Sequence, residues 1–551
     1  MNRVLLIPTV LLLILGSVCL FITRSHTAGT RPLVFCNADD IKTLDPGKMS
    51  WQNDIRTAMG MWEGLTAYDP KTLEPVPGVA ESWTISPDGK TYTFHLRSSA
   101  RWSNGDPVVA QDFLFAWQRV LTPATAADYV NLFFPIKGAE DYYNALDKNV
   151  TPAPSFSSVG IRSPDPHTIV IELANPCGYY LDLVAFSPYY PLHEKSMRPF
   201  LLDPADPAKG YDGAWTRPPA VVSNGPFQLT EWLFKRHLRL TFNPYYWDRA
   251  AVKTDTILIQ ALDDPRTALL AYQQGDVDVL SFVPQQFGEL LLKQRDEKQR
   301  TDIQYRPVFG TYYFVYNCQK KPFDDKRIRK ALALAIDKKK LVEEVTRMCQ
   351  APCNLLVPPD SIPFYRSPAG LPMDIAEARR LLAAAGFPGG QGFPAAEILY
   401  NNEAVHEKIA QAIGQMWQAN LGIAVTFRGI ERSSFGTDRR QHNFTIARGG
   451  WYGDYMDPAT WLDLAKTNDG NNDGLFSSPA YDALLKQAAA EPDRDKRFAI
   501  LRRAEQLLVE DEFPFIPLYQ YSDGYIFDPA KIEGLDLNVR LLTQFKYIHR
   551  K

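Results

Sequence analysis

Residues 448–455 bring together side chains that could hold both ends of a zwitterion. Their sequence is Arg-Gly-Gly-Trp-Tyr-Gly-Asp-Tyr. Asp454 could pair with an ammonium group, Arg448 could face a carboxylate, and Trp451 could form an apolar wall. Gly450 lacks a side chain and would let a bound chain approach the backbone closely. Taken alone, the same residues also fit a strand end followed by a turn, so the interpretation depends on the rest of the chain.

The first thirty residues predict export. A short positive start at residues 1–3 precedes an almost wholly apolar run at 4–23. Because roughly 20 apolar residues can span a bilayer, residues 1–30 are expected to be either a cleaved signal peptide or a retained membrane anchor. Lipid attachment at Cys19 is a third possibility, although the residues before it fit such a site poorly. The remaining chain is therefore expected in the periplasm or another extracytoplasmic space.

The cysteines fit that compartment. Cys349 and Cys353 lie four apart beside a proline-rich loop and could close a small disulfide ring in an oxidising environment. A metal pair is the alternative, but no matching histidine or cysteine pair lies nearby. Cys36, Cys177 and Cys318 are isolated in sequence and are expected to be buried free thiols. One further disulfide pair among the cysteines is also possible.

Length and charge limit the class of protein. A chain of 551 residues exceeds a single typical core and predicts two or three domains. The formal net charge of -3 provides no basic surface for nucleic acid, which is not expected as a partner. Metalloprotease helices and nucleophile elbows are absent from the sequence, since Ala410 and Met197 occupy the positions where a second zinc-binding histidine would stand.

The elements around residues 80–120 follow a specific order. Alternating residues 91–97 predict a strand, and the Pro-Asp-Gly turn at 87–89 precedes it. A second turn at 102–107 leads into a helix that is expected to continue from Ala110 through Val120.

The run from Ala80 to Val120 resembles the signature of the peptide- and nickel-binding family of extracytoplasmic solute receptors, family 5, which supply ATP-driven importers. Further motifs of that family follow in order over almost the whole mature chain, at residues 223–227, 243–247, 311–317, 322–332 and 377–387. Residues 399–423 and 439–455 resemble most the oligopeptide-binding members.

The resemblance implies an α/β fold with two lobes, a hinge and an additional domain. Ligand is then expected between lobes I and III. The implied boundaries are 31–63, 192–309 and 522–551 for lobe I, 64–191 for the extra domain, and 310–521 for lobe III.

The resemblance also implies roles for single residues. Asp454 stands where relatives bind the α-ammonium group of a peptide. Arg439, Arg448 and His406 are implied near the carboxyl end or side chains of the peptide, and Gly450 and Trp451 along the groove. The residues expected on the opposite side are Tyr129 and Asn37, the latter mainly through its backbone.

The implied function is that of a receptor without catalysis, cofactor or metal. Its partners would be short peptides and the permease and ATPase subunits of a membrane importer, and the protein would be a monomer. Alternatives of the same family are a dipeptide, a cell-wall peptide, a nickel chelate or haem as ligand. An extracellular peptidase that uses the same cleft is an alternative from another class.

Two departures from the family pattern concern selectivity. Related peptide binders often carry a crosslinked cysteine pair at the positions that Gly310 and Tyr452 occupy here, so that crosslink is absent. Arg432 replaces an aromatic residue of the relatives. It could favour acidic peptides, or it could point to solvent.

Overall fold

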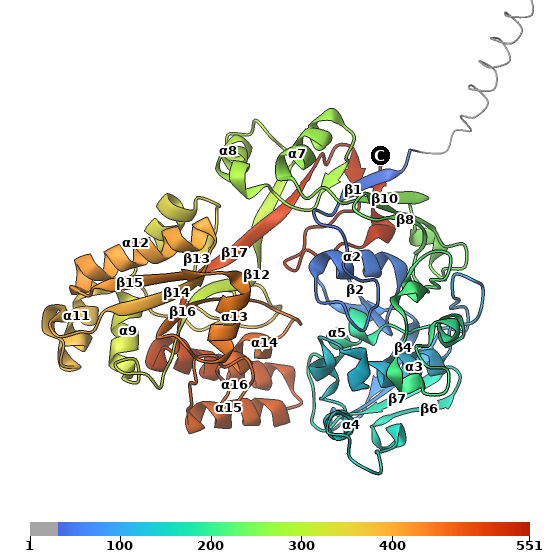
Figure 1. Cartoon of the computed structure of the whole chain (residues 1–551), viewed down its shortest axis with the longest axis horizontal. Coiled ribbons are helices and arrows are strands. Elements are labelled where there is room, and N and C mark those ends of the chain that lie inside the picture. Colours follow the sequence, from blue (N-terminus) through green and yellow to red (C-terminus); the bar gives the residue numbers. More distant parts are fainter. Residues whose placement is uncertain (1–30) are drawn as a thin grey trace, which may run out of the picture.

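The computed structural model describes residues 31–551. Figure 1 shows two bodies, one from the N-terminal part of the chain with the C-terminus beside it, and one from the C-terminal part. The expected signal peptide or anchor at residues 1–30 lies outside the described residues. Within residues 31–551, no helix combines the length and apolar character that crossing a membrane requires.

The largest sheet has eleven strands, and its long strands join the two bodies (Figure 1). The order is β15-β14-β16-β12-β17-β11-β1-β10-β9-β8, and β13 pairs with β17 beside this path. The bounds are Leu33–Cys36 (β1), Phe227–Leu233 (β8), His237–Phe242 (β9), Thr256–Gln260 (β10), Val279–Leu280 (β11), Ile303–Tyr316 (β12), Ala351–Pro352 (β13), Ala396–Asn401 (β14), Val425–Ile430 (β15), Ile446–Tyr452 (β16) and Phe515–Phe527 (β17).

Strands β12 and β17 are antiparallel and belong to both bodies. At one end Ile303 lies opposite Ile526, next to β11, and at the other end β12 pairs with β16. The pairing of β12 with β17 shifts register between Pro307 and Thr311. From Val308 onward every residue of β12 is buried, because side chains cover both faces of the sheet there. The domain boundaries expected near residues 310 and 522 fall inside these two strands.

Among the described residues, the body that contains β1 holds one end of the large sheet, a separate four-stranded sheet and two two-stranded sheets. Strand β1 pairs in parallel with β10 and β11, and a separate sheet has the order β4-β5-β7-β6. The expected strand at 91–97 and helix from Ala110 to Val120 are confirmed as β5 and α3. The strand bounds are Ala80–Ile85 (β4), Thr91–Leu96 (β5), Ile161–Asp165 (β6) and Thr168–Glu172 (β7), and two small pairs add Thr66–Tyr68 (β2), Pro75–Pro77 (β3), Ile532–Glu533 (β18) and His549–Arg550 (β19). The helices are Gln52–Met61 (α2), Ala110–Val120 (α3), Ala139–Asp147 (α4), Tyr180–Leu183 (α5), Glu194–Met197 (α6), Pro265–Gln274 (α7) and Gln285–Asp296 (α8).

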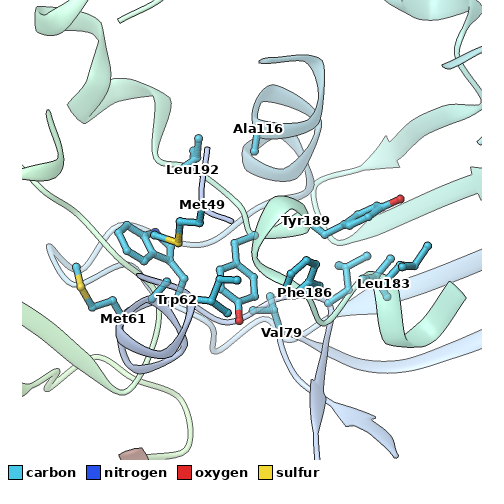
Figure 2. Close-up of a cluster of buried hydrophobic side chains, with 14 of the residues drawn as sticks. Met49, Met61, Trp62, Val79, Ala116, Leu183, Phe186, Tyr189 and Leu192 are labelled. Carbon is cyan, nitrogen blue, oxygen red and sulfur yellow. The ribbon is translucent and has the colours of Figure 1, made fainter. Parts of the chain in front are cut away.

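One buried cluster joins the expected lobe I to the expected extra domain (Figure 2). Met61 and Trp62 come from the start of the chain, and they pack in the same cluster as Leu183, Phe186 and Tyr189. Because this core crosses the boundary expected at residue 63, the two regions share apolar packing, which holds them against each other.

The other body surrounds strands β14, β15 and β16. Ile398 and Leu399 are consecutive in β14, and their side chains enter two different buried clusters on opposite faces of the sheet. The helices of this body are Lys326–Leu334 (α9), Lys338–Lys340 (α10), Ile375–Ala384 (α11), Ala404–Leu421 (α12), Arg432–Arg440 (α13), Ala459–Leu462 (α14), Pro479–Ala490 (α15) and Arg494–Gln506 (α16).

The expected disulfide between Cys349 and Cys353 is not formed, so this prediction was wrong. The buried Cys353 directs its Sγ to the backbone of Leu355, 3.4 Å from the nitrogen and 3.3 Å from the oxygen. Cys349 is exposed, and its Sγ lies 3.6 Å from Nη2 of Arg295. The spacing of four residues allows a ring, but the backbone between the cysteines turns the two thiols to different partners. Cys36 and Cys177 are buried free thiols as expected, and Cys318 is half-buried and free.

Candidate ligand-binding site

The candidate site lies where three parallel strands end. Strands β14, β15 and β16 run in parallel, and the backbone N–H of Asn402 donates to the carbonyl of Ile430 at 2.8 Å just past two of these ends. In open α/β sheets, ligands bind outside the carboxyl ends of the strands. His406 follows β14, Arg432 follows β15, and Arg448 is the first residue of β16 after its pairing with β14 ends. Residues far apart in sequence therefore meet at one edge.

Strand β16 has a free edge along residues 448–452. Strand β14 pairs with β16 only at Ile446 and Ala447, whereas β12 continues to pair as far as Tyr452. Within residues 31–551, no strand covers the other side of β16 beyond Ala447. Every second residue of such an edge offers its N–H and C=O outward, so this edge can accept an added extended chain.

A close approach of Tyr521 favours glycine at residue 450. A Cβ atom built on Gly450 would collide with the hydroxyl group of Tyr521. Trp451 is half-buried, and its Nε1 donates to Oγ1 of Thr460 at 3.2 Å. The expected groove residues 450 and 451 thus lie on the free edge, both half-buried, and the indole ring of Trp451 is held by a hydrogen bond.

Arg448 has no carboxylate partner among residues 31–551. Its guanidinium carbon lies 5.3 Å from the ring centre of Tyr312, and its Nε is buried without a hydrogen-bond partner. Tyr312 stacks on Tyr519, with ring centres 4.8 Å apart, and packs edge-on to Tyr521. A cation held among tyrosines without a counter-ion is suited to a carboxylate ligand.

His406 and Arg448 both lie against the side chain of Tyr312. Its Nδ1 lies 3.2 Å from the Tyr312 hydroxyl, and its Nε2 lies 3.2 Å from Oε2 of Glu403 without the alignment of a hydrogen bond. Burial, together with the charges of Arg448 and Arg432, lowers the pKa of His406 to about 3. The imidazole is therefore neutral at physiological pH and can act as a polar contact but not as a charge.

Asp454 follows β16 in a loop. Its backbone N–H donates to Oγ1 of Thr460 at 3.2 Å, and its carbonyl oxygen accepts from Arg540 at 2.7 Å. The carboxylate itself has no ion-pair or hydrogen-bond partner within the described chain. Burial raises the pKa of Asp454 to about 6, although the charge of Arg540 opposes this shift. An unpaired, poorly solvated carboxylate at a strand end marks a candidate functional group.

Tyr129 and Asn37 come from the other body. The ring of Tyr129 packs edge-on to Phe186 at 5.2 Å, and its pKa is raised by burial and further by the nearby charge of Asp454. The Asn37 side chain accepts from Arg56 at 2.5 Å and donates to the carbonyl of Asn53 at 3.0 Å. The charge of Asp454 therefore acts on Tyr129, whereas the Asn37 side chain forms its hydrogen bonds inside its own body.

Arg439 differs from Arg448 in having a counter-ion. It forms an ion pair with Asp473, and both side chains are largely buried. Its charge is thus already neutralised in this structure, and the sequence contained no spacing that indicated this pairing.

Other contributors to the site were missed in the sequence. Thr460 accepts hydrogen bonds from both Trp451 and Asp454, and Arg540 binds the Asp454 carbonyl. Thr460 lies six residues after Asp454, and Arg540 lies in the last segment of the chain, so no local pattern marked them. Within residues 31–551, no group of three or more histidine, cysteine, aspartate or glutamate side chains could hold a metal ion.

Two bodies joined by long strands, with unpaired charges at the carboxyl ends of parallel strands, define a bilobal solute-binding fold. A family model described as bacterial extracellular solute-binding proteins, family 5 Middle, matches residues 74–473, more than half of the chain. The chain therefore belongs to family 5 of the bacterial extracellular solute-binding proteins, as its sequence motifs predicted.

Individual relatives agree with this assignment. The periplasmic murein peptide-binding protein MppA of Escherichia coli (strain K12) is 32% identical over 505 residues, covering 91% of this chain and 89% of the relative. The oligopeptide-binding protein OppA of Bacillus subtilis (strain 168) is 33% identical over 475 residues, covering 85% and 83%. A solved structure of MppA, a periplasmic murein tripeptide-binding protein in an unliganded open form, superposes with a TM-score of 0.79 at 30% identity, covering 95% of this chain and 98% of that one. The expected α/β bilobal fold is confirmed.

Proposed function

We propose that this protein is an extracytoplasmic receptor that captures short peptides in extended form between two lobes and delivers them to a membrane importer. The observation that supports this proposal most directly is the free edge of β16, which has the unpaired cation of Arg448 near one end and the unpaired carboxylate of Asp454 just past the other. A peptide with free ends carries the matching charges and the matching backbone groups.

The charges set the direction of the bound chain. The peptide ammonium group lies at Asp454 and its carboxylate toward Arg448, so the peptide runs antiparallel to β16. A strand advances about 3.3 Å per residue, and residues 448–452 therefore span roughly 13 Å. This length suits a peptide of about three to five residues.

The remaining expected residues surround this peptide. Gly450 and Trp451 meet its backbone, Tyr129 closes the ammonium end, and His406 contributes a neutral polar group at the carboxyl end. On the opposite wall, only the carbonyl group of Asn37 is available, because its backbone N–H donates to the carbonyl of Gln260 at 2.9 Å. Arg439 assists only by fixing the local structure through Asp473.

The proposed domain division is the one expected from the sequence. Lobe I comprises 31–63, 192–309 and 522–551, the extra domain 64–191, and lobe III 310–521. Closure bends the chain within β12 and β17, where the register shift after Pro307 supports a hinge. The shared core of lobe I and the extra domain favours their movement as one unit.

The proposed partners and location are those that membership of the family suggests. The protein acts as a monomer in the periplasm or another extracytoplasmic space, and its permease and ATPase subunits lie in the membrane. Relatives are named as binding oligopeptides, dipeptides or murein peptides. A cell-wall peptide is the second candidate ligand, because Arg432 adds a positive charge near the carboxyl end of the site and such peptides carry additional carboxylates.

The proposal is tested by calorimetric titration with one tetrapeptide in two forms, free and N-acetylated. Asp454→Asn is expected to weaken binding of the free peptide by about 2–5 kcal/mol, because it leaves a poorly solvated ammonium group unpaired. The acetylated peptide is expected to bind weakly to both proteins. Equal binding of the two peptide forms by the unmodified protein would overturn the proposal, and appearance of cleaved products would favour the peptidase alternative.

A further inference from the structure

Asp182 connects three segments that are distant in sequence. It lies in α5, and its Oδ2 accepts from the backbone N–H of Met456 at 2.7 Å. Its Oδ1 accepts from Nη1 of Arg540 at 3.0 Å. The Asp182 and Arg540 side chains are only 5% and 6% exposed. This carboxylate therefore links the extra domain, the C-terminal segment and the loop that follows β16.

Arg540 continues the same network to the candidate site. Its Nη2 donates to the carbonyl oxygen of Asp454 at 2.7 Å, and its guanidinium lies over the ring of Tyr68 at 5.2 Å. The backbone is thus held at Asp454 by Arg540 and at Met456 by Asp182. Neither of these two side chains belongs to the segment that carries the candidate ammonium-binding carboxylate.

An aromatic contact supports the same junction. Tyr179 in the extra domain stacks on Tyr455, with ring centres 4.0 Å apart and an interplanar angle of 8°. Three consecutive residues, 454–456, are therefore each fixed by a residue from elsewhere in the chain. The carboxylate of Asp454 is the one charged group of this loop segment that remains without a partner within residues 31–551.

The charges explain why the Asp454 carboxylate stays free. Arg540 is the cation whose charge acts on it, but the guanidinium is already paired with Asp182 and binds Asp454 through the carbonyl oxygen. Removing the Asp182 charge would leave a poorly solvated cation beside the place where a ligand ammonium group would bind. Like charges at such short range in a partly desolvated site repel strongly.

We propose that Asp182 and Arg540 are positioning residues for the ammonium group of the ligand. Arg540 orients the Asp454 loop, so that the carboxylate of Asp454 is presented to the ligand. Asp182 holds Arg540 in place and neutralises its charge, so that the guanidinium does not repel the ammonium group of the ligand. This inference rests on the proposed function, because it assumes a ligand with a free amino group.

The test measures how strongly the protein prefers a free tetrapeptide to its N-acetylated form. Asp182→Asn keeps the shape of the side chain and removes its charge, and it is expected to lower this preference about tenfold. If Asp182 had a role in folding alone, its replacement would weaken binding of both peptide forms equally. The matched control is Asp45→Asn. Asp45 forms a similarly buried ion pair with Arg119 outside the candidate site, so its replacement is expected to leave the preference unchanged.

Each outcome decides one claim. An unchanged preference in a folded Asp182→Asn variant would overturn the positioning role while the proposed function stands. If the unmodified protein shows no preference, the proposed function fails, and this inference fails with it. If Asp182→Asn does not fold, Arg540→Lys is measured instead, because it keeps the positive charge but loses the two-pronged contact of the guanidinium. It is expected to lower the preference for the free over the N-acetylated peptide several-fold. An unchanged preference would contradict the inference.

Discussion

Arg448 and Asp454 lie six residues apart in one segment, and neither side chain has an oppositely charged partner within residues 31–551. By contrast, Arg439 near the start of the same region is paired with Asp473. Charges that are removed from water without a partner destabilise a folded protein. Their retention at the two ends of a free strand edge is therefore best understood as preparation for a ligand that supplies both counter-charges.

Arg448→Met is expected to remove recognition of the peptide carboxyl group. The unmodified protein should bind a free peptide more tightly than the same peptide with a C-terminal amide, by about 2–4 kcal/mol, because the guanidinium has no other counter-ion. In the variant this difference should disappear while the difference between free and N-acetylated peptides remains. Titration calorimetry with the three peptide forms measures both effects. A variant that still distinguishes carboxylate from amide would show that Arg448 is not the contact.

Asp454→Asn is expected to stabilise the empty protein near pH 7. The folded-state pKa of Asp454 is about 6, above its ordinary value of 3.8, so the folded protein binds this proton more tightly than the unfolded chain. The ionised carboxylate therefore destabilises the fold fully above pH 6, and the effect fades as the pH falls from 6 to below 4. The gain is about 1–2 kcal/mol, since the side chain keeps partial contact with water.

Scanning calorimetry of both ligand-free proteins at pH 7.5 and pH 4 checks this expectation. The variant should melt at a higher temperature at pH 7.5, and the two proteins should converge at pH 4. Other buried carboxyl groups, such as Glu505 and Asp463, contribute equally to both proteins and cancel from the difference. A variant that melts lower than the original protein at pH 7.5 would contradict the assigned burial of this carboxylate.

His406 is expected to remain neutral from pH 8 to pH 5. Its pKa is lowered to about 3, chiefly by burial and also by Arg448 and Arg432. Peptide affinity should therefore show no transition near pH 6.5 from this residue. Nuclear magnetic resonance of the imidazole Cε1 proton measures the titration directly, and His442, whose Nδ1 donates to the carbonyl of Asp473 at 2.9 Å, provides a second histidine for comparison. A His406 midpoint above pH 5 would be inconsistent with this burial.

Arg432 is expected to favour peptides with an acidic residue near the carboxyl end. The residue is exposed at the start of α13, and it has no carboxylate partner among the described residues. Arg432→Gln should reduce the preference for an acidic over a neutral peptide by a few-fold, and 0.5 M salt should have a similar effect on the original protein. Arg440→Gln at the opposite end of the same helix is the matched control. Equal effects of the two variants would show only a general change in surface charge.

The sequence was most informative where the site is contiguous. Asp454, Trp451, Gly450 and Arg448 occupy one short segment, so their residue types and spacing indicated the chemistry before the structure was known. The family motifs likewise predicted the two-body α/β fold, because many of them occur in a fixed order along the chain.

The contacts between distant segments could not be predicted in this way. The pairing of Arg540 with Asp182 joins residues that are 358 positions apart, and nothing local to either residue indicates the other. The disulfide prediction failed for a related reason, since the spacing of Cys349 and Cys353 does not determine the directions of the thiols. Tyr452 does lie opposite Gly310 in the pairing of β16 with β12, at the positions where relatives often carry linked cysteines. Its ring instead stacks on Tyr521, with ring centres 4.7 Å apart.

Native mass spectrometry of the mature protein shows whether the site holds short peptides by their free ends. The protein is measured as purified, and its ligands are then released under denaturing conditions and sequenced. Capture of short peptides by their free ends predicts a set of peptides of about three to five residues, and it predicts that Asp454→Ala loses them while remaining folded. A single non-peptide species such as haem or a metal chelate, or peptides retained equally by the variant, would contradict it.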